Sequence, residues 1–195
     1  MKKIAVVALD PLAGASYTKE VRDLFGEYAE VVGYSVRDGS AAGVLPRADL
    51  FAISTDAYGS AEEEARHVPI DSQIMSIEVT FYWETLKKLF EIPQGTKVLF
   101  VNVTSNMARE AITQLSSLGV NHLQFIPYYP GAVLEEPVDI AVTPGESRFV
   151  PPSVKTVIDC DHRPCSYGMM VEIALRLGLE YLDLYLIHWP VPGCF

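Results

Sequence analysis

The sequence predicts an α/β fold of parallel β-sheets covered by helices, and three observations indicate it. Apolar runs such as 4–9 and 97–103 are short and bounded by polar turns, as strands buried on both faces are. Amphipathic stretches alternate with these runs along the chain, which is typical of helices packed on both faces of a parallel sheet. Finally, Pro93-Gln-Gly95 breaks the chain near its middle, and a second series of strands and helices follows. We therefore expect two similar halves.

The first half is expected at residues 1–93 and begins with a strand rather than a signal peptide. The first apolar run is only six residues long before Asp10 and lacks a small-residue cleavage site. In the first helix, Val21 and Phe25 fall on one face, as the helical period requires. The expected elements are strands at 4–9, 30–36, 49–54 and 73–81 and helices at 15–28, 62–67 and 83–90.

The second half is expected at residues 94–180 and repeats the alternation of the first. Its expected elements are strands at 97–103, 122–127, 138–143 and 154–160 and helices at 106–118 and 167–178. Residues 181–195 are expected to form a separate C-terminal strand or tail of uncertain origin.

Composition and charge exclude several classes of function. The 195 residues are 49% hydrophobic, which is enough to build a real core. Asp and Glu total 25 against 15 Lys and Arg, for a net charge of −10, whereas nucleic-acid-binding modules carry a basic face. No segment reaches the roughly 18 apolar residues that a membrane span needs. We expect a cytoplasmic protein with no direct contact to nucleic acid or membrane.

The cysteines do not form a disulfide framework. The three are Cys160, Cys165 and Cys194, and the first two flank His162. A metal site is one interpretation of this cluster, but structural zinc sites pair their cysteines two to four residues apart, and these are five apart. We expect reduced thiols, no metal and no cofactor.

Polar residues gather where the expected strands end, and the strands themselves are nearly bare of them. In open parallel sheets, ligands bind beyond the carboxyl ends of the strands, so these residues are the candidate ligand contacts. We expect a ligand-binding rather than a catalytic set. The candidates are Thr55, Asp56, Thr104, Ser105, Asn106, Tyr128, Thr143 and Arg163.

The corner Thr104-Ser105-Asn106 joins an apolar strand to a helix, and it has two interpretations. Hydroxyl and amide side chains at a helix N-terminus satisfy the unpaired N–H groups there, so capping alone explains them. The same N–H groups also bind carboxylates and phosphates. We expect a small anionic or strongly polar ligand between 104–106 and either Arg163 or the loop 143–147, with the Arg163 fork adding specificity.

A family resemblance rests on six segments in order along the chain. They are D-L-F-A-I-S-T at 49–55, I-P-Q-G-T-K-V-L-F-V-N-V at 92–103, A-R-E-A-I-T-Q-L-S-S-L-G-V-N-H at 108–122, I-P-Y-Y-P-G at 126–131, D-I-A-V-T-P-G-E at 139–146 and V-P-P-S-V-K-T-V-I-D at 150–159. Together, residues 1 to about 178 resemble the N-terminal sensory region of sigma-54-dependent bacterial transcriptional activators, the group that includes the propionate-catabolism regulator.

The resemblance implies two flavodoxin-like, chelatase-like halves facing each other across a cleft where a small-molecule effector binds. In such activators the sensory region controls an ATPase domain and a DNA-binding helix-turn-helix. The printed chain has no Gly-x-x-x-x-Gly-Lys-Ser/Thr motif, so we expect a signal-input domain without its ATPase and DNA-binding domains. The resemblance does not name the effector.

The C-terminal residues differ from that family. The segment 175–193 resembles the fourth barrel strand of aldo-keto reductases, in which the residue matching His188 is catalytic. A complete barrel needs about 250 residues, and the matching Asp, Tyr and Lys are not found at that family's spacing.

Two alternatives to a sensor therefore stay open. One is an oxidoreductase-like enzyme or an isomerase-like enzyme of the two-cysteine racemase type, although all three cysteines follow residue 159. The other is a dimerisation module, in which the apolar segment 185–192 pairs with the sheet edge of a second copy in a homodimer.

Overall fold

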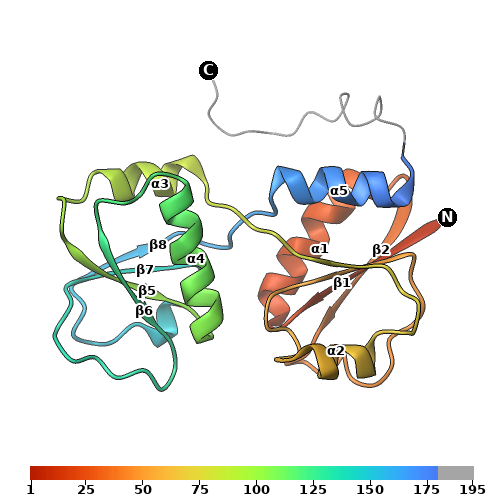
Figure 1. The fold of residues 1–195 in the computed structure, drawn as a ribbon, viewed down its shortest axis with the longest axis horizontal. Helices are drawn as coiled ribbons and strands as arrows, with labels where there is room; N and C mark the ends of the chain where they lie inside the picture. Colours follow the sequence, from red (N-terminus) through yellow and green to blue (C-terminus); the bar gives the residue numbers. More distant parts are fainter. Residues whose placement is uncertain (180–195) are drawn as a thin grey trace. The chain divides into compact units, whose positions relative to one another are not determined.

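The computed structural model describes residues 1–179 and confirms the predicted α/β class. It contains two four-stranded sheets whose strands are all parallel, consistent with two flavodoxin-like, chelatase-like halves (Figure 1). The predictions for 181–195, including those for His188 and Cys194, lie outside the described residues. None of the helices within 1–179 is long and apolar enough to cross a membrane.

The first sheet has the strand order β2-β1-β3-β4. Its strands are β1 (Lys2–Ala8), β2 (Ala29–Ser35), β3 (Leu50–Ile53) and β4 (Ile74–Ser76). This sheet belongs to the first of two compact units of the chain. The helices of the first unit are α1 (Pro11–Phe25), α2 (Ala61–His67) and α5 (Tyr167–Leu177).

The second sheet repeats this topology with the order β6-β5-β7-β8. Its strands are β5 (Lys97–Val101), β6 (Gln124–Tyr128), β7 (Ile140–Thr143) and β8 (Thr156–Asp159). This unit also contains α3 (Trp83–Phe90), α4 (Ser105–Ser117) and the 3-10 helix η1 (Ser147–Phe149).

The central strand of each sheet is buried on both faces, and alternate side chains serve separate cores. In β1, Ile4 and Val6 join a core with side chains of α1 and α5, whereas Ala5 and Val7 join the core of the opposite face. In β5, Phe100 packs with α3 and α4, and its neighbour Leu99 packs on the other face. This two-sided burial explains why the strands read as unbroken apolar runs rather than as alternating ones.

Local signals in the sequence set the ends of the helices. The Asp10 carboxylate caps α1 by accepting the N–H of Leu12 at 2.9 Å, and Pro11 occupies the first helical position, where it loses no hydrogen bond. At the other end of the described chain, Gly178 ends α5 with a φ of 70°, a conformation that glycine adopts without a steric cost.

Helices α3 and α5 each pack in a different unit from the strand that precedes them in the sequence. The chain divides into one unit formed by Met1–Val79 and the described residues from Pro164, and a second unit formed by Thr80–Arg163. Helix α3 follows β4 but belongs to the second unit, and α5 follows β8 but belongs to the first. The expected boundary after residue 93 would instead have assigned α3 to the first half and α5 to the second. Their amphipathic faces indicate that each must cover a sheet but do not say which sheet.

The two chain segments that connect the units are paired where they leave the first unit. Val79 and Cys165 form an antiparallel bridge, and the N–H of Ser166 donates to the carbonyl oxygen of Glu78 at 2.7 Å. The N–H of Cys165 donates to the Glu20 carboxylate of α1 at 2.8 Å. The strand expected at 73–81 is therefore shorter, since beyond β4 this segment pairs with the returning chain.

We expect Ile173→Ala to destabilise the first unit specifically, by about 2–5 kcal/mol, because it leaves a cavity under α5. Ile173 is fully buried in the core that contains Ile4 and Val6. Hydrogen exchange followed by mass spectrometry should show faster exchange in peptides of 1–79. The control is Leu175→Ala, whose side chain is 58% exposed and which should change exchange little. Faster exchange confined to 80–163 would contradict the assignment of α5 to the first unit.

Candidate functional site

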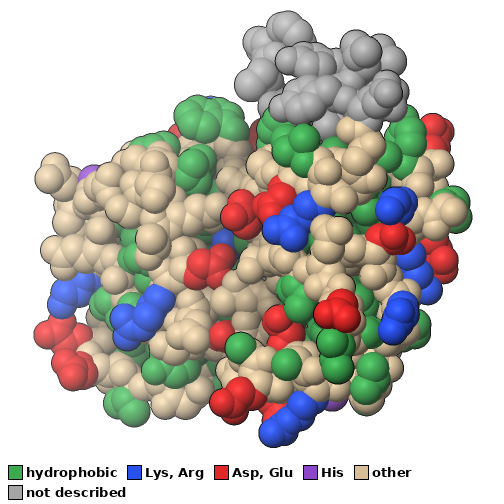
Figure 2. All heavy atoms as spheres, turned by 45° about the vertical axis from the view of Figure 1, so that its right-hand side comes forward, with side chains coloured by type: hydrophobic (Ala, Val, Ile, Leu, Met, Phe, Trp, Pro, Cys, Tyr) green, Lys and Arg blue, Asp and Glu red, His purple; other side chains and the backbone are tan. Residues whose placement is uncertain are grey.

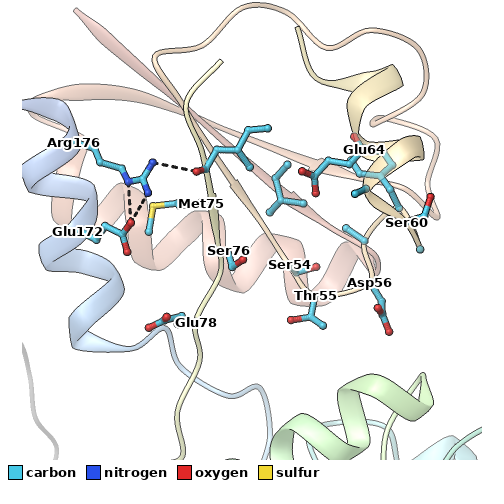
Figure 3. Close-up of a pocket in the computed structure, with 16 residues that line it drawn as sticks. Ser54, Thr55, Asp56, Ser60, Glu64, Met75, Ser76, Glu78, Glu172 and Arg176 are labelled. Carbon is cyan, nitrogen blue, oxygen red and sulfur yellow. Dashed lines mark hydrogen bonds and ion pairs between the residues drawn. The ribbon is translucent and has the colours of Figure 1, made fainter. Parts of the chain in front are cut away.

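The first unit contains a hollow of about 620 Å³ beside the carboxyl ends of β3 and β4. Figure 3 shows Ser54, Thr55 and Asp56 on one side of β4 and the Glu172–Arg176 pair of α5 on the other. Most of the side chains around it are hydroxyls and carboxylates. The lining consists of Ile53, Ser54, Thr55, Asp56, Ala57, Tyr58, Gly59, Ser60, Ala61, Glu64, Ile74, Met75, Ser76, Glu78, Glu172 and Arg176.

The loop after β3 brings several of these groups to the hollow. Asp56 has a φ of 56°, in the left-handed region that Asp occupies more readily than most residues. Four residues later, Ser60 caps α2 by accepting the N–H of Glu63 at 3.2 Å. The first turn of α2 then places Glu64 at the wall of the hollow.

Two hydroxyls in this wall are buried without a hydrogen-bond partner among the described residues, namely Ser54 Oγ and Tyr58 OH. The Tyr58 ring stacks on His67, with the ring centroids 4.7 Å apart and the planes 7° from parallel. Burial raises the pKa of Tyr58 to about 12, and the Glu64 carboxylate adds to this rise, so the phenol stays protonated. An unpaired buried hydroxyl costs about 1–3 kcal/mol. Water or a bound ligand would reduce this cost.

The Glu64 carboxylate is partly buried and makes no ion pair with another described residue. Burial raises its pKa above the ordinary value of 4.5, because water solvates the charged form less well there. Glu78 lies on the segment after β4, and its carboxylate accepts a hydrogen bond from Ser166 Oγ at 3.3 Å. Neither carboxylate forms an ion pair within residues 1–179, so both are available to a positively charged group.

Arg176 is held by contacts on all three of its guanidinium nitrogens. Nε donates to Glu172 at 2.8 Å, Nη2 lies 2.6 Å from the same carboxylate, and Nη1 donates to the carbonyl oxygen of Ile74 at 3.1 Å. Figure 3 shows this network against β4. The Glu172 carboxylate therefore offsets the positive charge of Arg176 and weakens its attraction for an incoming carboxylate or phosphate.

The charges around the hollow are predominantly negative. Asp56, Glu64, Glu78 and Glu172 contribute four carboxylates against the single guanidinium of Arg176. The face in Figure 2 carries acidic side chains with Lys and Arg interspersed, in keeping with the net charge of −10. Such a hollow attracts cations and neutral polar molecules more than anions.

Of the eight predicted contacts, the structure places Thr55 and Asp56 in this hollow. The sequence pointed to the other lining residues only in part. Ser60 and Glu63 form a readable helix-start pattern, and Ser76 and Glu78 alternate with buried Met75 and Ile77 as the outer face of a strand should. Glu172 and Arg176 were missed, because nothing local indicates that α5 returns to the first sheet.

The predicted corner of the second unit serves as a helix cap. Thr104 Oγ1 accepts the N–H of Met107 at 3.1 Å, so Thr104 is the capping residue and Ser105 the first residue of α4. Ser105 Oγ accepts from Arg109 Nε at 3.4 Å, and Asn106 is exposed. The capping interpretation thus accounts for Thr104, and ligand contact at this corner stays a prediction.

Tyr128 and Thr143 lie at the ends of strands, as expected. Tyr128 ends β6 and packs partly buried on the core around Leu99. Thr143 is fully buried at the end of β7, where its hydroxyl accepts the N–H of Glu146 at 3.0 Å. The Thr143 hydroxyl therefore braces the following turn.

Arg163 differs from its expected placement. We expected it to face 104–106 across a bound ligand, but its Nη2 donates to Gln114 at 2.9 Å and lies 3.4 Å from Glu110. Gln114 follows Ser105 by nine residues, which corresponds to about 14 Å along a helix. Arg163 is 94% buried with its guanidinium 4.9 Å from the Phe81 ring centroid, so it joins α4 to the segment before α3.

The described cysteines are buried and free. Burial raises the pKa of Cys160 to about 12 and raises that of Cys165 as well, so both thiols are protonated near neutral pH. Cys160 Sγ donates to the carbonyl oxygen of Thr143 at 3.1 Å. Within residues 1–179, no three His, Cys, Asp or Glu side chains converge as a metal site would require.

No protein-family model matches the chain, and no solved structure matches it. The functional assignment therefore depends on the chemistry of the site, since an α/β fold of this kind hosts many unrelated functions. The resemblance to bacterial sensory regions stays a prediction.

We expect Arg163→Ala to lower the free energy of unfolding of the second unit by about 2 kcal/mol, because charged hydrogen bonds are lost in a buried setting. Urea unfolding should show the loss, and Arg163→Lys should recover only part of it, since Lys lacks the planar fork. Arg109→Ala, on the exposed side of α4, is the matched control. An unchanged urea midpoint for Arg163→Ala would show that the buried contacts do not stabilise the fold.

We expect Glu20 to make stability fall as pH rises. Burial raises the pKa of Glu20 in the folded protein above the ordinary 4.5, so the folded state holds a proton that the unfolded state releases. The contribution of Glu20 to the free energy of unfolding is complete below pH 4.5. It disappears as the pH rises through the raised pKa of Glu20 in the folded state. The urea midpoint of the wild type should therefore fall further across this pH range than that of Glu20→Gln. Urea midpoints that change with pH in the same way for both proteins would contradict the raised pKa.

Proposed function

We propose that the chain is a small-molecule effector-sensing, signal-input domain of a bacterial transcriptional regulator, and that the hollow of the first unit holds the effector. The observation that carries this proposal is the hollow itself, about 620 Å³ in volume and lined from β3, α2, β4 and α5. Pockets for small molecules usually measure about 300–1,000 Å³. The hollow also lies beside the carboxyl ends of parallel strands, where α/β folds usually bind ligands.

The chemistry of the lining supports binding by hydrogen bonds. Hydroxyls of Thr55, Ser60 and Ser76 surround the hollow, and the buried hydroxyls of Ser54 and Tyr58 lack partners among the described residues. Each can donate and accept, so together they suit a ligand with several polar groups. The raised pKa values of Cys160 and Cys165 weigh against the racemase-like alternative, which needs thiolates.

A sensor must also pass its signal to the rest of the regulator, and the hollow is connected to both segments that link the units. Glu78 lines the hollow one residue before the first crossing and is hydrogen-bonded to Ser166 at the start of α5. Glu172, in the second turn of α5, lines it as well. A ligand that contacts Glu78 and Glu172 would stabilise one arrangement of the two linking segments, which is how differential binding shifts a conformational equilibrium.

The resemblance described above supports the regulatory context, in which an ATPase and a DNA-binding domain would receive the signal. The reductase-like and dimerisation alternatives depend on 181–195, which lie outside the described residues. They stay predictions beside this proposal.

We expect a thermal-shift screen of organic acids, sugars, amines and aromatic metabolites to yield a compound that raises the melting temperature by mass action. Ser76→Trp should abolish this rise, because the indole would occupy the hollow from an exposed position on β4. The matched control is Gln73→Trp, exposed just before β4 and outside the lining. A hit that Ser76→Trp leaves unaffected would place the effector elsewhere.

A further inference from the structure

We propose that the hollow of the first unit selects a small organic molecule that carries a protonated amine together with hydroxyl groups. This inference rests on the function proposed above, because it names the class of ligand for the same site. The proposed ligand differs in charge and in place from the anionic or strongly polar ligand that the sequence predicts between 104–106 and Arg163 or the loop 143–147, which stays a prediction.

The charge of the hollow is the first step. Its four carboxylates come from the loop after β3, from α2, from the segment after β4 and from α5, so they surround the space instead of forming one exposed row. Arg176 is the one cationic side chain in the described lining. Its nitrogens contact Glu172 and the carbonyl oxygen of Ile74. Carboxylates outnumber this guanidinium around the hollow, so an anion would be repelled there, whereas an ammonium group would be attracted.

Glu64 is the carboxylate best suited to receive the ammonium group. It is partly buried, forms no ion pair within 1–179, and lies close enough to Tyr58 to influence that phenol. A partly desolvated carboxylate without an opposite charge is unfavourable, and a bound ammonium would supply that charge with a charge-assisted hydrogen bond.

The remaining lining distinguishes an organic amine from a metal ion. The carboxylates are too dispersed to meet at one ion, since no three acidic or metal-ligating side chains of the described residues converge. A hollow of about 620 Å³ is also far larger than an ion requires. The hydroxyls of Thr55, Ser60 and Ser76 complement the hydroxyl groups of a ligand that spans the space between the carboxylates.

Two matched series of compounds test the inference: glucosamine, glucose and glucuronate, and 2-amino-1,3-propanediol, glycerol and glycerate. Each series holds the size of the compound nearly constant and changes its charge from positive to neutral to negative. Binding is followed from the amide shifts of 54–60 and 76–78 in NMR titrations at low salt. We expect the amines to bind at least tenfold more tightly than the carboxylates, with an affinity that falls as salt rises.

Substitution of the acceptor completes the test. Glu64→Gln should weaken binding of the amines about tenfold and leave the neutral compounds unchanged. The matched control, Glu62→Gln, removes the same charge from the same helix at an exposed position outside the lining and should have little effect.

The outcomes separate the two proposals. Neutral or acidic members that bind the hollow as tightly as the amines would overturn the amine assignment and leave the sensor proposal standing. Six compounds that leave these amides unshifted at millimolar concentration would also overturn it. The sensor proposal fails as well only if the wider metabolite screen finds no ligand for the hollow.

Discussion

The need to cover both faces of two parallel sheets governs this structure. A central strand such as β1 buries Ile4 and Val6 on one face and Ala5 and Val7 on the other, so each face requires its own layer. In the first unit α1 and α5 cover one face. In the second unit α3 and α4 do so. Because α3 and α5 each follow a strand of the other unit, the chain must cross between the units twice, and the first unit completes its core from two separate segments of the chain.

The exchange of helices also builds the candidate site. Without α5 the space beside β4 would open along the edge of the sheet, and the carbonyl oxygen of Ile74 would lose its bond to Arg176. With α5 in place, the Glu172–Arg176 pair closes one side of the hollow. The same helix begins at Ser166, which is bonded to Glu78 where the other linking segment leaves the unit. The proposed ligand contacts and the connection between the units therefore share one small set of residues.

Electrostatics gives the hollow its character. Acidic side chains are common in this chain, but most lie on the surface, where water and salt weaken their influence. Around the hollow four of them enclose a common space, and the only guanidinium in the described lining is held by Glu172. By contrast, the positive charge that the sequence suggested for a ligand, Arg163, is used inside the second unit to join α4 to Phe81. Negative charge thus characterises the candidate site, whereas the buried positive charge of Arg163 stabilises the second unit.

The sequence by itself determined the elements and their class. Apolar runs, amphipathic periods and capping residues are local, so the strand at 97–103, the helix after it and the cap at Thr104 were readable, as was the place of Thr55 and Asp56 at a strand end. Only the tertiary structure decided which sheet α3 and α5 cover, since an apolar helix face fits either one. For the same reason it alone decided that Glu172 and Arg176 line the same hollow as Ser76 and Glu64, about a hundred residues earlier in the sequence, and that Arg163 contacts α4.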